Sequence, residues 1–76
     1  MYSYNIAKNA DEKAFSQTCS AIELGIGGIK KEELLTDVDG SQIQVYSTGT
    51  SKIKVYNDYE IDAVYADSDI DLSGIL

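Results

Sequence analysis

The chain has 76 residues, a formal net charge of −7, thirteen acidic residues, six lysines and no histidine or arginine. This length predicts that residues 1–76 form a single domain with a thin core, because such a short chain buries only about 60% of its unfolded surface. The acidic balance argues against direct binding to nucleic acid or to anionic lipid, both of which are recognised by cationic side chains. It favours a partner with a positively charged surface.

The cysteine count and the N-terminal segment both bear on the compartment. Cys19 is the only cysteine, so we expect a buried thiol in a reducing compartment rather than half of a disulfide. The first residues lack the basic start and apolar run of a signal peptide, and no apolar run approaches the ~20 residues of a membrane span. We therefore expect a cytoplasmic protein that does not enter a membrane.

Residues 1–24 predict a strand followed by an amphipathic helix. Tyr2, Tyr4 and Ile6 alternate with small polar residues, which is the period of a strand. Asn9 and Glu12 have the spacing of a capping box, and a helix from about residue 10 to residue 24 fits. Its apolar stripe has the i, i+3, i+4, i+7, i+11 spacing of a buried helix face. It consists of Phe15, Thr18, Cys19, Ile22 and Ile26, with Ala14 alongside.

A period of two begins near residue 33 and predicts a β-hairpin. Asp39-Gly40 favours a two-residue type I′ turn, in which both central residues need positive φ. With that loop, residue 34 lies opposite residue 45, and one face of the hairpin becomes apolar while the other becomes polar. The predicted buried face carries Leu34, Val38, Ile43 and Val45, and the opposite face carries Gln42, Gln44 and Tyr46.

Two more strands, over residues 52–56 and 59–65, follow a Ser/Thr/Gly turn and a second tight turn at Asn57-Asp58. The predicted fold class is α+β, with one helix packed on a small antiparallel sheet in the order β-α-β-β-β, with or without a further strand. We expect the helix stripe to pack against Ile43, Val45, Ile53, Val55 and Ile61. The sequence leaves open whether residues 67–76 are ordered.

The acidic residues of the C-terminal third fall at every second position. If each triplet lies on one strand, its carboxylates share a face and stand about 6.6 Å apart, close to the spacing of phosphates along nucleic acid. The alternative is that these acids only protect a strand edge from aggregation. The predicted acidic ladder consists of Asp58, Glu60, Asp62, Asp67, Asp69 and Asp71.

Tyrosines give a second candidate surface. We expect Tyr46 and Tyr56 to lie exposed on the sheet face opposite the helix. Because tyrosine is enriched at the centres of interfaces, this face is a candidate binding surface. The alternative is a solvated face with cross-strand aromatic pairs. Tyr2, Tyr4, Tyr59 and Tyr65 are expected to complete the core with their hydroxyls at its rim.

The sequence contains few of the residues that catalysis or metal binding requires. Without histidine, most nucleophile–base pairs are excluded, and we expect no enzyme activity and no cofactor. Asp67, Asp69 and Asp71 match the first acids of a calcium loop, but Leu72 stands where the loop requires glycine. We therefore predict no metal site.

In size, charge and spacing the chain resembles phage-encoded inhibitors and nucleic-acid mimics that block restriction, repair or CRISPR effectors. We therefore expect a small acidic, non-catalytic protein-binding module, such as an anti-CRISPR or anti-restriction inhibitor, that masks a basic surface. Its partner would be a protein with a basic surface, such as a protein that itself binds nucleic acid. The alternative is a structural or regulatory accessory subunit that binds through a tyrosine-bearing sheet face or an unpaired strand edge.

Overall fold

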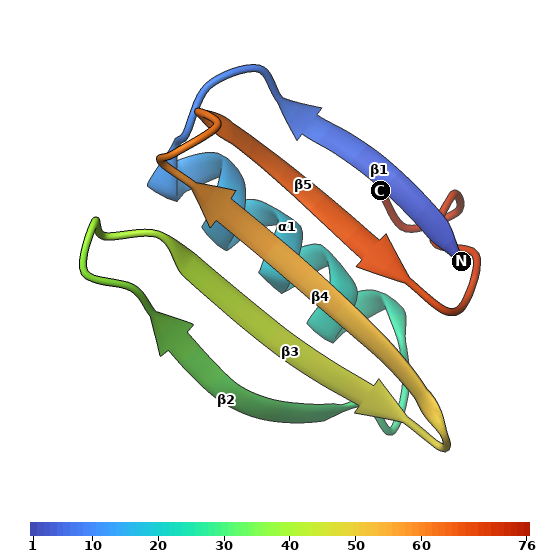
Figure 1. The fold of residues 1–76 in the computed structure, drawn as a ribbon. Coiled ribbons are helices and arrows are strands. Elements are labelled where there is room, and N and C mark those ends of the chain that lie inside the picture. The colour runs from blue at the N-terminus through green and yellow to red at the C-terminus, as the bar shows by residue number, and fades with distance from the viewer.

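A computed structural model describes all 76 residues and confirms the α+β fold class. One helix packs on a five-stranded antiparallel sheet, in the order β-α-β-β-β-β (Figure 1). The helix, α1, is too short and too polar to span a membrane. The elements are β1 (Tyr2–Ala7), α1 (Glu12–Gly25), β2 (Lys30–Thr36), β3 (Gln42–Thr48), β4 (Ser51–Asp58) and β5 (Ala63–Ser68).

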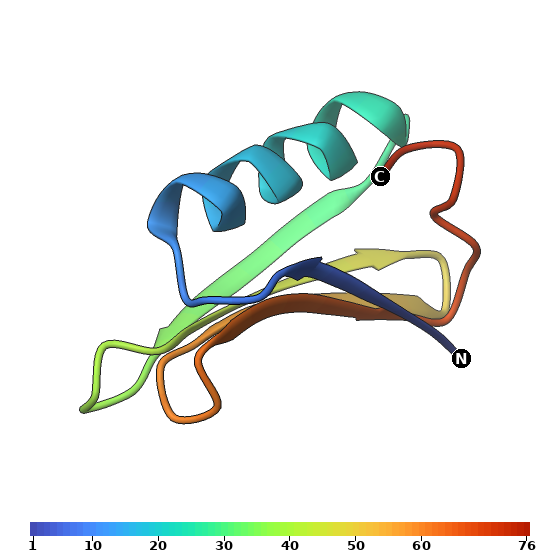
Figure 2. The same cartoon turned by 90° about the horizontal axis from the view of Figure 1, so that it is seen from above.

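The strand order across the sheet is β1-β5-β4-β3-β2. Strands β2 to β5 form a meander of neighbours, and β1 joins it by pairing with β5. The helix therefore connects the two edge strands by crossing the sheet. Figure 2 shows α1 on one side of the sheet and no element over the other side, which we call the open face.

The helix forms much as its sequence pattern predicts. Phe15, Thr18, Cys19 and Ile22 are all buried, which confirms the apolar stripe at these four positions and places the free thiol of Cys19 in the interior. Ile26 follows the end of the helix as its C-cap and is half-buried. The N-cap is Asp11, two residues later than expected, and its carboxylate accepts from the amides of the first turn. Capping by a short acidic side chain satisfies amides that the helix leaves without a partner.

The β2–β3 hairpin corrects the predicted register. Leu34 lies opposite Gln44, not opposite residue 45. The connection is a three-residue loop in which the amide of Gly40 donates to the carbonyl of Asp37 at 3.1 Å, and Gly40 has a φ of +89°. A turn of this kind, closed by a glycine bulge, differs from a type I′ turn by one residue. A one-residue slip moves every side chain to the other face of the sheet.

The core consequently differs from the predicted one on β3. Ile53 and Val55 are buried as expected, but Ile43 and Val45 lie on the open face and Ile61 is 62% exposed. In their place, β3 contributes Tyr46, β5 contributes Val64 and Ala66, and the segment after β5 contributes Leu72. The buried cluster consists of Phe15, Cys19, Ile22, Tyr46, Ile53, Val55, Val64, Ala66 and Leu72.

The C-terminal segment after β5 is ordered and completes the core. Leu72 is fully buried, and its amide donates to the hydroxyl of Tyr4 at 2.7 Å. Ile75 packs against Gly25 at the end of α1, where a Cβ atom would lie 2.9 Å from the Ile75 side chain. The segment thus ties β1 to the end of the helix.

Both edge strands carry register irregularities. The pairing of β1 shifts between Asn5 and Ala7, and that of β2 shifts between Lys31 and Leu34. Irregular edges and charged side chains on them discourage pairing with another chain. The register shifts therefore make either edge less able to pair with another chain.

Candidate functional site

The first acidic triplet does not lie on one strand. β4 runs on to Asp58, and the chain then turns through residues 59–62 before β5 begins. The carboxylate of Asp58 accepts from the amides of Glu60 and Ile61 at 2.9 and 3.2 Å, which is how an aspartate stabilises a turn. The predicted ladder is therefore wrong at Asp58, Glu60 and Asp62, because turn formation overrides the period of two.

Asp62 closes that turn and joins it to the start of the helix. It adopts a positive φ of 56°, and its carboxylate accepts from Asn9 Nδ2 and from the amide of Ala10, both at 2.8 Å. The Ala10 amide, and then Asn9, hold the pKa of Asp62 below its usual value. This acid has a structural role in the fold.

The second acidic triplet is equally dispersed. Asp67 lies in β5 on the open face and accepts from Ser3 Oγ at 2.9 Å. Asp69 and Asp71 follow β5 rather than extending it. Asp69 accepts from the amide of Lys52 at 2.9 Å, and Asp71 accepts from the Tyr4 hydroxyl at 3.0 Å. The regular spacing predicted for Asp67, Asp69 and Asp71 is thus wrong, and no cluster of acids or cysteine that could hold a metal ion forms anywhere in the chain.

Of the two predicted interface tyrosines, only Tyr56 lies on the open face. Tyr46 is fully buried under α1, which corrects its predicted exposure and follows from the one-residue register slip. The Tyr46 hydroxyl donates to the carboxylate of Glu23, which also pairs with Lys31. Burial, and then this carboxylate, raise the pKa of Tyr46 well above its ordinary value, so the hydroxyl remains a hydrogen-bond donor.

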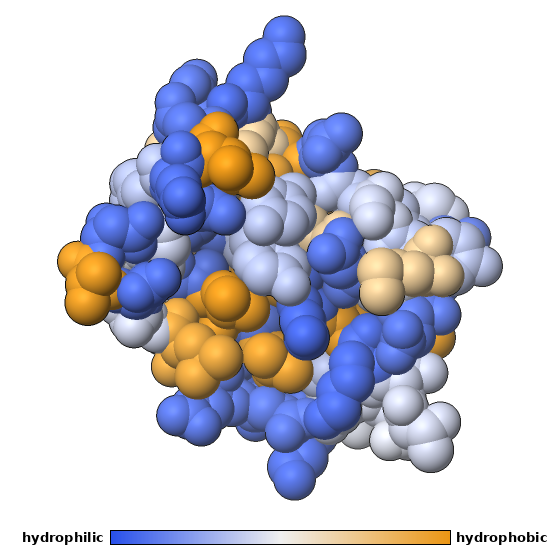
Figure 3. Space-filling model, in the orientation of Figure 1, coloured by the Kyte–Doolittle hydropathy of each residue, from blue (hydrophilic) through white to orange (hydrophobic).

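The open face presents a row of apolar and aromatic side chains that crosses four strands. The pairing places Leu35 beside Ile43, Ile43 beside Tyr56, and Tyr56 beside Tyr65. Leu35 is 46% exposed and the other three are half-buried. The rings of Tyr56 and Tyr65 are stacked, with centroids 4.4 Å apart and planes 11° apart. We call these four residues the open-face row; Figure 3 shows orange apolar atoms gathered on this side of the molecule.

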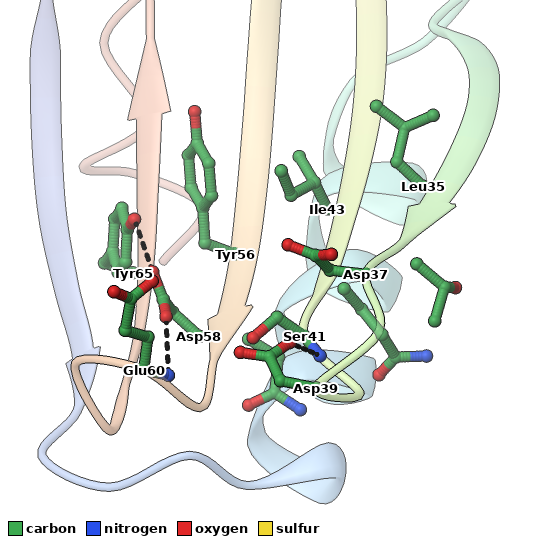
Figure 4. A pocket seen from close by; sticks show the side chains of 12 residues that line it. Leu35, Asp37, Asp39, Ser41, Ile43, Tyr56, Asp58, Glu60 and Tyr65 are labelled. Carbon is green, nitrogen blue, oxygen red and sulfur yellow. Dashed lines mark hydrogen bonds between the residues drawn. The ribbon is translucent and has the colours of Figure 1, made fainter.

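The open-face row forms the apolar wall of an acidic groove of about 300 Å³, which the β2–β3 loop and the β4–β5 turn complete (Figure 4). No lysine lines the groove, and neither of the two salt bridges of the protein involves its acids. Burial, and then the charge of Asp58, raise the pKa of Tyr65. The four acids of the groove are Asp37, Asp39, Asp58 and Glu60.

The groove combines residues that the sequence pattern assigned to different places. Asp58, Glu60 and Tyr56 are predicted site residues, and the fold brings them together. Ile43 was expected in the core, Asp39 only in a hairpin turn, and Asp37 only in the strand before that turn. The Asp-Val-Asp-Gly-Ser stretch is the one signal that could have located them, because it also fits a three-residue loop, which turns Ile43 outward.

Comparison with models of known protein families, with curated proteins and with solved structures gave no match. The class of protein is therefore defined here by its fold and by the surface that the fold leaves open. That class is an α+β domain with a single helix, whose sheet has one uncovered face carrying an apolar and aromatic row beside unpaired carboxylates.

Proposed function

We propose that this chain is a non-catalytic protein-binding module whose open face binds the basic surface of another protein. The observation that carries the proposal is the continuity of the open-face row with the acidic groove. Interface centres favour exposed tyrosine with aliphatic neighbours. Carboxylates without a cationic partner at the edge of such a centre complement lysine and arginine on the other side.

A protein partner suits this surface better than a small molecule does. The groove, at about 300 Å³, lies at the lower end of the range for small-molecule sites. The open face extends beyond the groove across the sheet, through Val45 on β3, Lys54 on β4 and Asp67 on β5. A net charge of −7 adds a long-range field that attracts a basic partner and accelerates association.

Masking of the partner is the biological consequence that we propose. A module that covers a basic surface with a tyrosine-bearing face prevents that surface from binding nucleic acid or another acidic ligand. This inhibitory role does not require a regular row of carboxylates, which the fold does not form. The buried, single thiol of Cys19 fits a reducing compartment, and we propose that the protein acts in the cytoplasm.

The test of this function is a pair of matched variants. Ile43→Glu places a negative charge in the middle of the open-face row, and Leu24→Glu makes the same change on the helix, where Leu24 is 90% exposed. Each tagged variant and the native protein are used to capture partners from cells that express the chain, and captured proteins are identified by mass spectrometry. We expect a basic protein that is captured by the native chain and by Leu24→Glu but not by Ile43→Glu.

Salt dependence then separates masking by charge from an accessory role. Steering by exposed charges weakens with salt, because the Debye length is about 10 Å at 0.1 M. Association of the captured partner should slow as ionic strength rises, whereas an uncharged sheet-face interface would change little. Equal capture by Ile43→Glu and the native chain, with both folded, would rule out the open face as the binding surface.

A further inference from the structure

A second hollow lies on the side of the sheet that faces the helix, away from the open face. α1 packs over β4 and β1, and β2 lies to one side of it (Figure 1). Leu34 on β2 belongs to the helix-facing side, because it pairs with the buried Gln44, yet it is 45% exposed. Between Leu34 and α1 lies a cleft of about 420 Å³, a volume within the range of small-molecule sites. We call it the helix cleft, and the residues that decide its chemistry are Phe15, Cys19, Leu34 and Gln44.

Apolar side chains bound the helix cleft on two sides. Phe15 and Cys19 lie four residues apart on one face of α1, and Leu34 faces them from β2. Phe15 and Cys19 belong to the core cluster, so the cleft opens directly onto the core. A flat ring in this space contacts the Phe15 side chain on one side and Leu34 on the other, and aromatic pairs add to the gain from burial alone.

One buried acceptor in the helix cleft has no donor within the protein. Gln44 is 3% exposed, and its Nε2 donates to the carbonyls of Glu32 and Val45 at 2.8 and 3.1 Å. Because both partners are acceptors, they must face the NH₂ group, which fixes the orientation of the amide. No group of the protein donates to Oε1, and the only unpaired side-chain polar atom that is sealed from solvent is Asn57 Nδ2. Oε1 therefore opens into the helix cleft, where a ligand can donate to it.

The charges at the rim of the helix cleft are already compensated. Lys31 closes one end by pairing with Glu23 on α1 at 3.3 Å, and Glu23 also accepts from the Tyr46 hydroxyl. At the other end, Glu12 lies in the first turn of α1, where the helix dipole offsets its charge. An anionic ligand finds no free cation here, and a neutral ligand fits the cleft better than an ion of either sign.

We propose that the helix cleft binds a small, neutral, flat aromatic molecule that carries one ring N–H, of the indole class. The ring lies between Phe15 and Leu34, and its N–H donates to Gln44 Oε1. A purely apolar molecule of the same shape would cover that acceptor without supplying a donor, which costs binding free energy. The helix cleft and the open face lie on opposite sides of the sheet, so this site does not depend on the proposed function.

The test compares indole with benzofuran, which has the same shape but an oxygen in place of the N–H. Both are titrated into the native protein, and amide NMR shifts should map to residues 15–20, 31–34 and 42–44. We expect saturable binding of indole with a Kd at or below about 1 mM. Benzofuran should bind at least about tenfold more weakly, because a site that pairs with an N–H rejects an analogue without one. Equal affinity for the two, or no saturation by indole at about 10 mM, would overturn the proposal.

Blocked tryptophan amide distinguishes a free ligand from a side chain of a partner protein. It carries the same ring and N–H, and its fluorescence reports binding because the protein has no tryptophan. We expect it to bind no more tightly than indole, because its peptide groups lie outside the cleft. Tighter binding than that of indole would overturn the assignment to a free molecule in favour of a partner's tryptophan.

Two neighbouring leucines on opposite faces of β2 give a matched pair of variants. Leu34 and Leu35 are 45% and 46% exposed, and only Leu34 lines the helix cleft. Leu34→Ser should weaken indole binding at least about fivefold, because it removes apolar contact area, whereas Leu35→Ser should leave it within about twofold. Equal binding by the two variants would place the ligand elsewhere and overturn the proposal.

Gln44→Met tests the hydrogen bond itself. It removes the acceptor at nearly constant length and should reduce the preference for indole over benzofuran to within about twofold. Gln44 also joins β3 to β2 through Glu32, so the amide spectrum of the variant is first compared with that of the native protein. An unchanged preference in a folded Gln44→Met would overturn the role of Oε1, and if this variant does not fold, the leucine pair and the two ligands decide the proposal.

Discussion

Replacing Tyr46 and Tyr56 one at a time by phenylalanine tests the register of the sheet. The sequence pattern put both hydroxyls on the open face, so that neither should contribute to stability. In the structure the Tyr46 hydroxyl is buried and donates to Glu23, whereas the Tyr56 hydroxyl has no partner within the protein. The two substitutions remove the same atom from opposite faces of the sheet.

The expected cost of Tyr46→Phe follows from the environment of Glu23. A hydrogen bond to a charged group contributes about 1.5–3 kcal/mol to stability. The Glu23 side chain is 37% exposed and keeps Lys31 at 3.3 Å, so water and Lys31 compensate it after the loss, and the lower value of about 1.5 kcal/mol applies. With a urea m-value of about 1 kcal/mol per molar for so small a domain, the unfolding midpoint should fall by about 1.5 M.

Urea unfolding followed by circular dichroism measures both variants under the same conditions. Tyr56→Phe should change the free energy of unfolding by less than about 0.5 kcal/mol, as for a surface substitution. A loss below about 0.5 kcal/mol for Tyr46→Phe, or a larger loss for Tyr56→Phe, would refute the register and return Tyr46 to the open face.

Three further substitutions or conditions test other parts of the fold. Leu72→Ala should cost about 2–5 kcal/mol by chemical denaturation, because it empties a fully buried site; a loss under about 1 kcal/mol would mean that the C-terminal segment is not docked. Gly40→Val should cost about 1–3 kcal/mol, because a β-branched residue resists the φ of +89°, and unchanged amide exchange in the hairpin would contradict the loop. Acid should destabilise the protein, because the pKa of Asp62 is held below its usual 3.8 and that of Glu23 below 4.5. Their contribution is present above these values and is lost as pH falls through the lowered folded-state pKa, so a thermal midpoint that does not fall between pH 5 and pH 2 would contradict these contacts, and Asp62→Asn should reduce the fall.

The helix and the fold class could be predicted because their signals are local. The spacing from Phe15 to Ile22 describes one helix face whatever the rest of the chain does. The change from a helical to a strand period, with Gly25 at the boundary, separates the helix from the meander. Neither inference depends on which strand pairs with which.

The register of β3 could not be predicted in the same way. Asp39-Gly40 fits both a two-residue and a three-residue loop, and these differ by the one residue that decides the face. Hydropathy then favoured the wrong choice, because Ile43 and Val45 are more apolar than Gln44 and Tyr46. What stabilises the true register is hydrogen bonding of buried polar groups, since Gln44 Nε2 donates to the carbonyl of Glu32 at 2.8 Å. Hydropathy patterns do not contain that information.

Some acidic residues use their carboxylates for hydrogen bonds within the fold, whereas others leave them free to contact a partner. Most of the predicted ladder is occupied within the fold, where Asp58 and Asp62 stabilise a turn and its contact with the start of the helix. The free acceptors of the acidic groove come from two loops separated along the chain, at Asp37 and Glu60, so no linear spacing could have indicated them. Neutralising an acid such as Asp62 therefore tests stability, whereas neutralising Asp37 with Glu60 tests binding. A substitution chosen from the period of two alone would mix these effects, and a loss of binding could then reflect a weakened turn rather than a lost contact with the partner.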